Sequence, residues 1–338
     1  MKLREVNEVI DCLSKDREVF FYYKNRYAEI ILKEVLRYTN SIRVIKDSVY
    51  SKLLSIKHIK EAIAYCGNGR IESDDIYFDW NADCFPFTIT YSKWGCDKYQ
   101  YQTSRRGYSL VVQLNFSNLH AEQYQKFYKP TESCVFNYWG HPVINDKASD
   151  GLVKSARETL AWARIDLDFN TNEALIEEIQ TDWIRLAKRE LFRLQEINQS
   201  DNNSNSEISA YASDAKIENA IEYLSTVLKP YENIWAEAML ACSLNLLFNE
   251  IGIKQIFYHD HVSGRIIKDI PGRSPPRSLY TTLPRRFCFE SSLFGPSFIE
   301  ESRVFKKLRK AYSFLKWQEL NISNLQFGEN YEEVQQAA

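Results

Sequence analysis

Four polar residues stand in an otherwise apolar stretch, 174–183 (ALIEEIQTDW), where burial should be deepest. The stretch reads as a strand that runs into the start of a helix, and an unpaired carboxylate buried there would cost several kcal/mol. Alternate residues of a strand share a face, so Glu178, Gln180 and Asp182 should project together. With Glu177 they form a candidate catalytic site. The alternative is an edge strand whose polar face is exposed to solvent.

The strand-like stretch before it, 160–169 (LAWARIDLDF), adds Asp166 and Asp168. Metal-dependent nucleases of the PD-(D/E)xK type place an Asp on one strand of a hairpin and Glu-x-Lys on the next. Here Glu178 and Gln180 supply Glu-x-Gln. Two carboxylates would bind Mg²⁺ while the third group orients the attacking water. A Mg²⁺-dependent nuclease is therefore one hypothesis for this chain.

The segment 265–286 is a basic run, with six lysines or arginines against a single acid, Asp269. Arginine binds carboxylates and phosphates through paired N–H groups, so Arg273 and Arg277 are candidate ligands for an anionic molecule. The run as a whole would suit a nucleic-acid backbone. The six residues are Arg265, Lys268, Arg273, Arg277, Arg285 and Arg286.

Two histidines, His259 and His261, flank Asp260 at the predicted end of a strand. Paired histidines on one strand face can bind a metal ion. No third ligand stands at an evident spacing, so ordinary polar residues at a strand end are the alternative. We predict no metal site from this pair.

Composition excludes several classes. The 338 residues are 44% apolar and 14% aromatic, enough for a substantial core, and the net charge of −2 rules out a general polyanion binder. No apolar stretch approaches 18 residues, so we expect neither a signal peptide nor a membrane span. The seven cysteines are scattered and never form Cys-x-x-Cys, which favours free thiols, no zinc site and a cytoplasmic location.

The order of predicted elements indicates an α+β fold with a mixed, mostly antiparallel central sheet. Residues 1–69 have helical spacing, including 20–38, and predict a helical N-terminal module. Residues 70–325 predict a mixed domain that contains a mobile polar insertion at 199–216, and 326–338 read as a tail. Within the mixed domain, strands are expected at 76–78, 85–94, 108–116, 136–144, 160–169, 174–183 and 254–259, and helices at 119–128, 183–195, 232–252 and 302–317.

The motif EEIQTDW at 177–183 resembles the EEIQSDW signature of a domain found in large polyvalent proteins of phages and mobile elements. The likeness extends over roughly 155–290, through WAEAML, NEIGIKQIFYH and PPRSLYTTLPRRFCFE. The resemblance implies a phage-related or mobile-element role but names no activity. A non-enzymatic binding or inhibitory protein, with a protein partner and with the motif's polar groups paired internally, is therefore another hypothesis.

The succession of elements also resembles the fold of GNAT-type N-acetyltransferases. In that resemblance, 160–169 and 174–183 are the third and fourth strands and 254–259 is the fifth. The central helix would be 232–252, and 278–290 (SLYTTLPRRFCFE) resembles the family's LYxxxGF segment. The resemblance implies an acyltransferase-like enzyme that acylates an amine with acetyl-CoA as cofactor.

The resemblance assigns roles to individual residues. Glu177 or Glu178 would act as general base on the amine, and Tyr280 would protonate the departing thiolate. The family binds the CoA pyrophosphate at a glycine-rich turn after the fourth strand, where backbone amides cradle the phosphates. The corresponding turn here, TDWIRLAKREL, contains no glycine. The cradle would be replaced by the positive charges of Arg185, Lys188 and Arg189.

Overall fold

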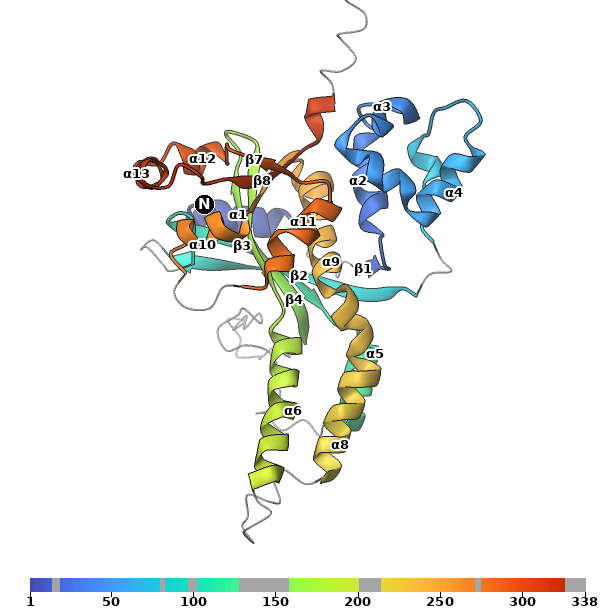
Figure 1. The fold of residues 1–338 in the computed structure, drawn as a ribbon, viewed down its shortest axis with the longest axis vertical. Helices are drawn as coiled ribbons and strands as arrows, with labels where there is room; N and C mark the ends of the chain where they lie inside the picture. Colours follow the sequence, from blue (N-terminus) through green and yellow to red (C-terminus); the bar gives the residue numbers. More distant parts are fainter. Residues whose placement is uncertain are drawn as a thin grey trace, which may run out of the picture.

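A computed structural model describes residues 1–13, 19–79, 83–96, 102–127, 158–200, 214–270 and 275–325. At its centre is an open sheet of eight strands in the order β1-β2-β3-β4-β5-β6-β8-β7 (Figure 1). The sheet is mixed and mostly antiparallel, and helices pack around it. This is the predicted α+β class.

One neighbouring pair of strands is parallel, β5 (Glu173–Gln180) with β6 (Gln255–His259). The other pairs are antiparallel. Parallel neighbours need a long crossover, because the chain must return to the starting edge of the sheet. Helices α6 (Asp182–Ser200), α8 (Asp214–Glu222) and α9 (Lys229–Asn245) supply it.

The N-terminal module is not purely helical. The helical prediction for 20–23 was wrong, because Val19–Tyr22 forms β1, which pairs antiparallel with β2 (Phe85–Cys96). Phe20 and Tyr22 are buried while Val19 and Phe21 are exposed. This is the alternation of a strand, but four residues are too few to distinguish it from a helical pattern in the sequence. The helical elements are α1 (Leu3–Cys12), α2 (Tyr27–Val35), α3 (Ile42–Lys46), η1 (Val49–Ser55), α4 (Lys57–Tyr65) and η2 (Ser73–Asp75).

The predicted strand at 76–78 was also wrong, because these residues pair with no other strand. The strands predicted at 85–94 and 108–116 are confirmed as β2 and β3 (Gly107–Asn115). The helix predicted after them is α5 (Asn118–Phe127). The strand predicted at 136–144 lies outside the described residues.

Strands β4 (Thr159–Asp168) and β5 form the predicted hairpin. Its turn uses Asn172 in the left-handed region (φ 57°), a conformation that asparagine tolerates better than most residues. The Asp168 carboxylate accepts hydrogen bonds from the backbone of the turn. Both strands are buried along most of their length, so they form the centre of the sheet.

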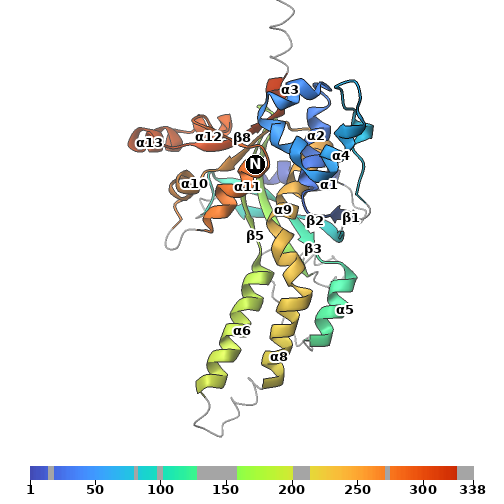
Figure 2. The ribbon, with the colours of Figure 1, turned by 45° about the vertical axis from the view of Figure 1, so that its right-hand side comes forward.

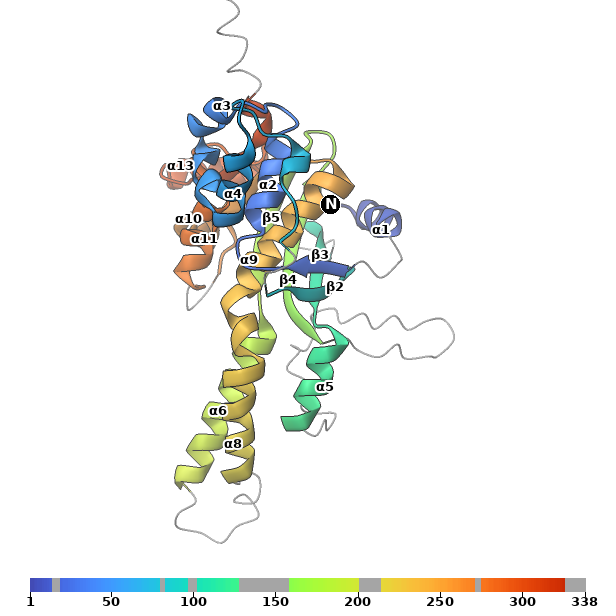
Figure 3. The same ribbon diagram turned by 90° about the vertical axis from the view of Figure 1, so that its right-hand side faces the viewer.

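Helices α6 and α8 pack side by side and extend away from the sheet as an arm (Figures 2 and 3). The predicted insertion at 199–216 overlaps the end of α6 and the start of α8, and its middle lies outside the described residues. Helix α9 leads from the arm back to the sheet, where it contacts β3, β4 and β5. Gly252 (φ 83°) ends this helical stretch as predicted, because its left-handed conformation is unfavourable for other residues.

The C-terminal part contains a strand that the sequence did not predict, β8 (Trp317–Asn321), which lies between β6 and β7 (Glu290–Ser292). Only Trp317 and Leu320 of β8 are buried, so its pattern does not alternate.

The 302–317 helix prediction is confirmed for α13 (Arg303–Ala311). The remaining elements are α10 (His261–Ile267), η6 (Arg277–Tyr280), α11 (Thr282–Arg286), α12 (Ser297–Glu300) and η7 (Ile322–Leu325). The predicted tail, 326–338, lies outside the described residues.

Every helix within the described segments is too short or too polar to cross a bilayer. The six cysteines in these segments are all free thiols, as predicted, and the seventh, Cys134, lies outside them.

Candidate functional site

Strand β5 contains a β-bulge at the start of its EEIQ stretch, residues 177–180. Arg164 of β4 lies opposite Glu178, but the next residue of β4 lies opposite Ile176, so Glu177 is the extra residue. The parallel pairing of β5 with β6 ends at the same point, where Ile176 pairs with Tyr258. Bulges re-aim side chains, end strand pairing and are frequent beside active sites. Glu177 and Glu178 therefore lie at the point where the pairing of β5 with β6 ends.

Glu177 is held by two neighbours, the buried His259 and the partly buried Ser104. Its Oε2 lies 3.0 Å from Nε2 of His259, and Ser104 donates from its backbone N (3.1 Å) and its Oγ (2.9 Å). Burial alone would raise the pKa of Glu177. The hydrogen bond with His259 and the positive charges of Lys268 and Arg164 outweigh burial, and they lower that pKa to about 2. Glu177 is therefore ionised at neutral pH and is a weak base.

Glu178 is paired with two cations. Arg164 Nη2 lies 3.0 Å and Lys268 Nζ 3.6 Å from its carboxylate. These charges lower the pKa of Glu178 despite its burial. Lys268 also donates to the main-chain oxygen of Glu177 at 2.8 Å. Burial lowers the pKa of this lysine, whose side chain is only 1% exposed. The lysine thus joins the end of α10 to the bulge in β5.

Tyr280 is brought next to the glutamates from η6. Its ring stacks on Tyr258 with centroids 5.3 Å apart, and Lys268 Nζ lies 6.0 Å from its centroid. Burial, and then the negative charge of Glu178, raise the pKa of Tyr280. The predicted base and the predicted acid are therefore neighbours, and the tyrosine keeps its proton at neutral pH.

His259 is fully buried, and its Nδ1 has no hydrogen-bond partner. Burial lowers the pKa of His259, so we assign a neutral ring that carries its proton on Nε2, facing Glu177. Nδ1 then holds a free lone pair. Gly264 of α10 lies directly against the ring: a Cβ there would stand 2.7 Å from the Cβ of His259. The one neutral base of the cluster is therefore covered by a helix.

Gln180 and Asp182 belong to a second network. Asp182 accepts hydrogen bonds from Trp162 Nε1 (2.9 Å), from Gln180 Nε2 (2.6 Å) and from Arg185. Asp182 is buried and is the first residue of α6. A negative side chain at a helix N-terminus is stabilised by the helix dipole. The Asp182 carboxylate therefore occupies the N-terminal end of α6, so that end already has an anion supplied by the protein.

The residues predicted to bind a cofactor are dispersed. Lys188 pairs with Glu232 of α9, and Arg185 pairs with Asp182 in its own helix. Arg189 is exposed on α6. Arg273 lies outside the described residues, and Arg277 lies in a separate groove described below.

The carboxylates of the nuclease hypothesis are bound by arginines. Arg105 contacts both oxygens of Asp166, at 2.5 and 2.8 Å, and lies 3.6 Å from Asp168. Glu178 has its own arginine, Arg164. The described residues contain no group of three or more histidine, cysteine or carboxylate side chains placed to hold a metal ion. His261 is turned away from His259 and contacts the backbone oxygen of Pro275.

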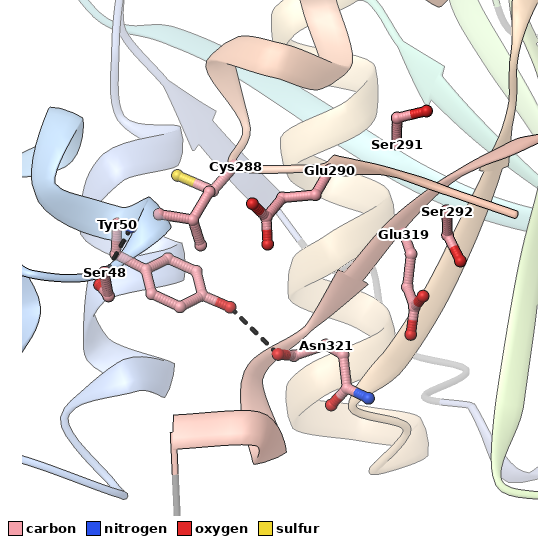
Figure 4. A pocket seen from close by; sticks show the side chains of 9 residues that line it. Ser48, Tyr50, Cys288, Glu290, Ser291, Ser292, Glu319 and Asn321 are labelled. Atoms are coloured by element: carbon pink, nitrogen blue, oxygen red, sulfur yellow. Dashed lines mark hydrogen bonds between the residues drawn. The ribbon is translucent and has the colours of Figure 1, made fainter. Parts of the chain in front are cut away.

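An acidic pocket of about 430 Å³ lies between η1 and the β7–β8 pair (Figure 4). Glu290 and Glu319 lie opposite each other on the two strands. Burial raises the pKa of the neighbouring Cys288 to about 12, so this thiol stays protonated and unreactive. Tyr50 closes one side through its hydroxyl, which donates to the backbone oxygen of Asn321.

A larger groove, of about 770 Å³, has the opposite charge. Arg277 of η6, Arg285 of α11 and Lys316 before β8 line it, and all three are exposed. The one acid among its described lining residues, Asp260, accepts hydrogen bonds from the first backbone N–H groups of α10. We call this the basic groove. Its other lining residues are His261, Val262, Ser263, Thr281, Phe289, Ser291, Phe314 and Gln318.

The predicted basic run thus separates into different environments. Lys268 is buried in the glutamate cluster, and Arg286 pairs with Glu237 of α9. Arg277 and Arg285 face the basic groove. Two members of the glutamate cluster, Arg164 and Ser104, were not singled out from the sequence. Arg164 gave a signal, because a charged residue inside the apolar stretch 160–169 must find a buried partner.

Comparison with known proteins leaves the chain without a match: no protein-family model, no curated protein and no solved structure matches it.

Proposed function

We propose that this chain is a binding protein for an anionic ligand, built on a fold of the GNAT acyltransferase type. The observation that carries the proposal is the basic groove, in which Arg277, Arg285 and Lys316 converge from three separate elements. Its volume, about 770 Å³, falls within the range of roughly 300–1,000 Å³ that is usual for ligand sites.

The described part of the chain does not neutralise the groove. Among the described residues, no acid lies within ion-pair distance of Arg277 or Arg285, and Lys316 is 3.9 Å from Asp260. That carboxylate already accepts from the backbone of Val262 and Ser263. Three neighbouring like charges raise one another's free energy, and a bound anion would relieve that repulsion.

The glutamate cluster supports binding over catalysis. Its two carboxylates have lowered pKa values, and both have protein partners. A general base works best with a pKa near the working pH and within reach of its substrate. The neutral base, His259, is covered by α10. We assign the cluster a structural role, which is to hold β5 and β6 together where their pairing ends.

The strand order supports the GNAT-type fold. Strands β4 and β5 form the antiparallel hairpin that the resemblance assigns to the third and fourth strands. Helix α9 then leads to β6, which pairs parallel with β5 as its fifth strand.

The test is ligand-induced thermal stabilisation with inorganic tripolyphosphate. A ligand at about 100 times its dissociation constant stabilises a protein by roughly 2.7 kcal/mol. We expect a shift of a few degrees that disappears in the double variant Arg277→Gln/Arg285→Gln. Lys60→Gln, an exposed charge change on α4, is the control and should behave like the unchanged protein. An equal shift in the double variant would refute the groove as the binding site.

A second candidate, an acetyl-CoA-dependent acyltransferase, is favoured by one observation: Glu178 and Tyr280 are neighbours at the bulge. In this reading, Glu178 deprotonates an amine and Tyr280 protonates the thiolate. We then expect acetyl-CoA to stabilise the protein, and Glu178→Gln to abolish acyl transfer without loss of the fold. Acetyl-CoA that gives no thermal shift would argue against this candidate.

The Mg²⁺-dependent nuclease has less support, because Arg105 and Arg164 already neutralise the carboxylates it requires. Mg²⁺ binding that is lost on Asp168→Ala, measured by calorimetry, would restore it.

A further inference from the structure

We propose that the ligand of the basic groove is a single-stranded nucleic acid. An unpaired base would stack on Phe314, while the adjoining phosphates lie on the groove arginines and on helix α13. This inference rests on the proposed function, because it assigns the chemical class of the anion that the groove binds.

Phe314 is the aromatic surface of the groove. It lines the groove, and its residue is 55% exposed, so the ring is accessible to a ligand there. Tyr312 packs against it edge-on, with ring centroids 5.9 Å apart, and is itself 40% exposed. Single-strand binding sites combine such stacking surfaces with positive charge along the backbone path.

Helix α13 extends the positive charge beyond the groove. Its exposed cations are Arg303, Lys306, Lys307 and Lys310, and none of them pairs with an acid among the described residues. The helix stands at the periphery of the molecule, beyond α10 (Figures 1 and 2). The chain runs from α13 through Tyr312 and Phe314 to Lys316 in the groove. Along the chain, Phe314 therefore lies between the cations of α13 and Lys316.

This combination selects against other anions. A small phosphate would use the arginines but gain nothing from Phe314. A duplex presents its phosphates but keeps its bases paired, so their faces cannot stack on a side chain. A single strand can use both features, and it needs no particular sequence because every base has a π-face.

The test measures fluorescence anisotropy of a labelled oligothymidylate, with the same length of duplex DNA as a comparison. We expect Phe314→Ala to weaken single-strand binding about 5- to 150-fold, which corresponds to the roughly 1–3 kcal/mol of stacking per base. The same variant should bind tripolyphosphate as the unchanged protein does. Phe192→Ala removes a similarly exposed phenylalanine (59%) from α6 and should change neither.

Salt dependence gives an independent readout. For single strands the slope of log affinity against log salt is about −0.7 per neutralised phosphate. We expect Arg277→Gln/Arg285→Gln to make the slope shallower by roughly 1.4, and Phe314→Ala to leave it unchanged.

The outcomes separate the two proposals. If oligothymidylate binds but Phe314→Ala has no effect, or if duplex DNA binds equally well, the nucleic-acid inference is overturned and the anion groove stands. If neither oligothymidylate nor tripolyphosphate binds, the proposed function itself fails. Selective loss of single-strand affinity in Phe314→Ala supports both.

Discussion

At the scale of residues, the centre of this protein is a set of buried charges that neutralise one another. Glu177, Glu178, Arg164 and Lys268 lie together at the bulge of β5, with His259 beside them. Taking such charges out of water is costly, and only a fully paired arrangement offsets that cost. Removing one member should therefore destabilise the fold far more than a surface change.

Glu177 gives a prediction with a defined pH dependence. Its folded pKa of about 2 lies below the usual 4.5, so ionised Glu177 stabilises the fold above pH 4.5 and this contribution is lost as the pH falls toward 2. The contribution amounts to about 3 kcal/mol. We expect Glu177→Gln to lower the urea unfolding free energy by about this amount at pH 7, with a difference from the unchanged protein that shrinks below pH 4.5.

The control for this measurement is Glu218→Gln, which changes an exposed carboxylate on α8. A Glu177→Gln protein as stable as the control at pH 7 would contradict the role assigned to the cluster.

At the scale of elements, a separate buried hydrogen-bond network, centred on Tyr223, joins the arm to the sheet. Tyr223 lies in the π-helical turn Tyr223–Val227, after α8. Its hydroxyl accepts a hydrogen bond from Trp183 of α6 (2.7 Å) and lies 3.0 Å from Nε2 of His120 in α5. The His120 ring also stacks on Phe116 at 3.6 Å. The Tyr223 hydroxyl therefore connects three helical elements: α5, α6 and the π-helical turn that contains Tyr223.

We expect Tyr223→Phe to destabilise the protein by about 1–3 kcal/mol, because it removes the buried hydroxyl that accepts from Trp183 and contacts Nε2 of His120. Chemical denaturation followed by tryptophan fluorescence would measure the loss. Tyr65→Phe, which removes a hydroxyl from a residue that is 87% exposed, should have no measurable effect. Equal stability of the two variants would show that the phenol is not what joins the arm to the sheet.

At the scale of the whole molecule, the N-terminal elements and the sheet share one core. Strand β1 extends the sheet, and apolar residues of α2 such as Ile31 and Val35 belong to the same buried cluster as the faces of β4 and β5. Glu237 of α9 reinforces this contact: it accepts from the Tyr22 hydroxyl (2.7 Å) and pairs with Arg286. The molecule should therefore unfold as a unit.

Native-state hydrogen exchange tests this expectation. We expect the slowest amides of α2 and β4 to exchange with the same free energy. Glu237→Ala should lower both equally, by about 1–3 kcal/mol, because it leaves the buried Tyr22 hydroxyl without its acceptor. Much faster exchange in α2 than in β4 would mean that the N-terminal elements open independently.

The sequence by itself determined the elements whose pattern is long and regular. The hairpin 160–183, the buried helix 232–252 and the strand at 254–259 were all predicted, because their periodicity spans several turns or pairs. The apolar strand pattern predicted burial of Glu177 and Glu178, and a resemblance added Tyr280 to the same site. In the structure, Lys268 Nζ lies 3.6 Å from the Glu178 carboxylate and 6.0 Å from the centroid of the Tyr280 ring. Short elements such as β1 and β8 were missed, since each needs a distant partner strand to exist.

The tertiary structure alone decided what the polar residues do. Strand alternation placed Glu178, Gln180 and Asp182 in one group, but their partners divide them between two networks. Glu178 pairs with Arg164 and Lys268, whereas Gln180 donates to Asp182. Lys268 and Arg277 are close in a single basic run, yet one is buried in an ion-pair cluster and the other lines a groove. Residue type and spacing fix which charges exist. Whether a charge is neutralised inside or left open to a ligand depends on partners that lie far away in the chain.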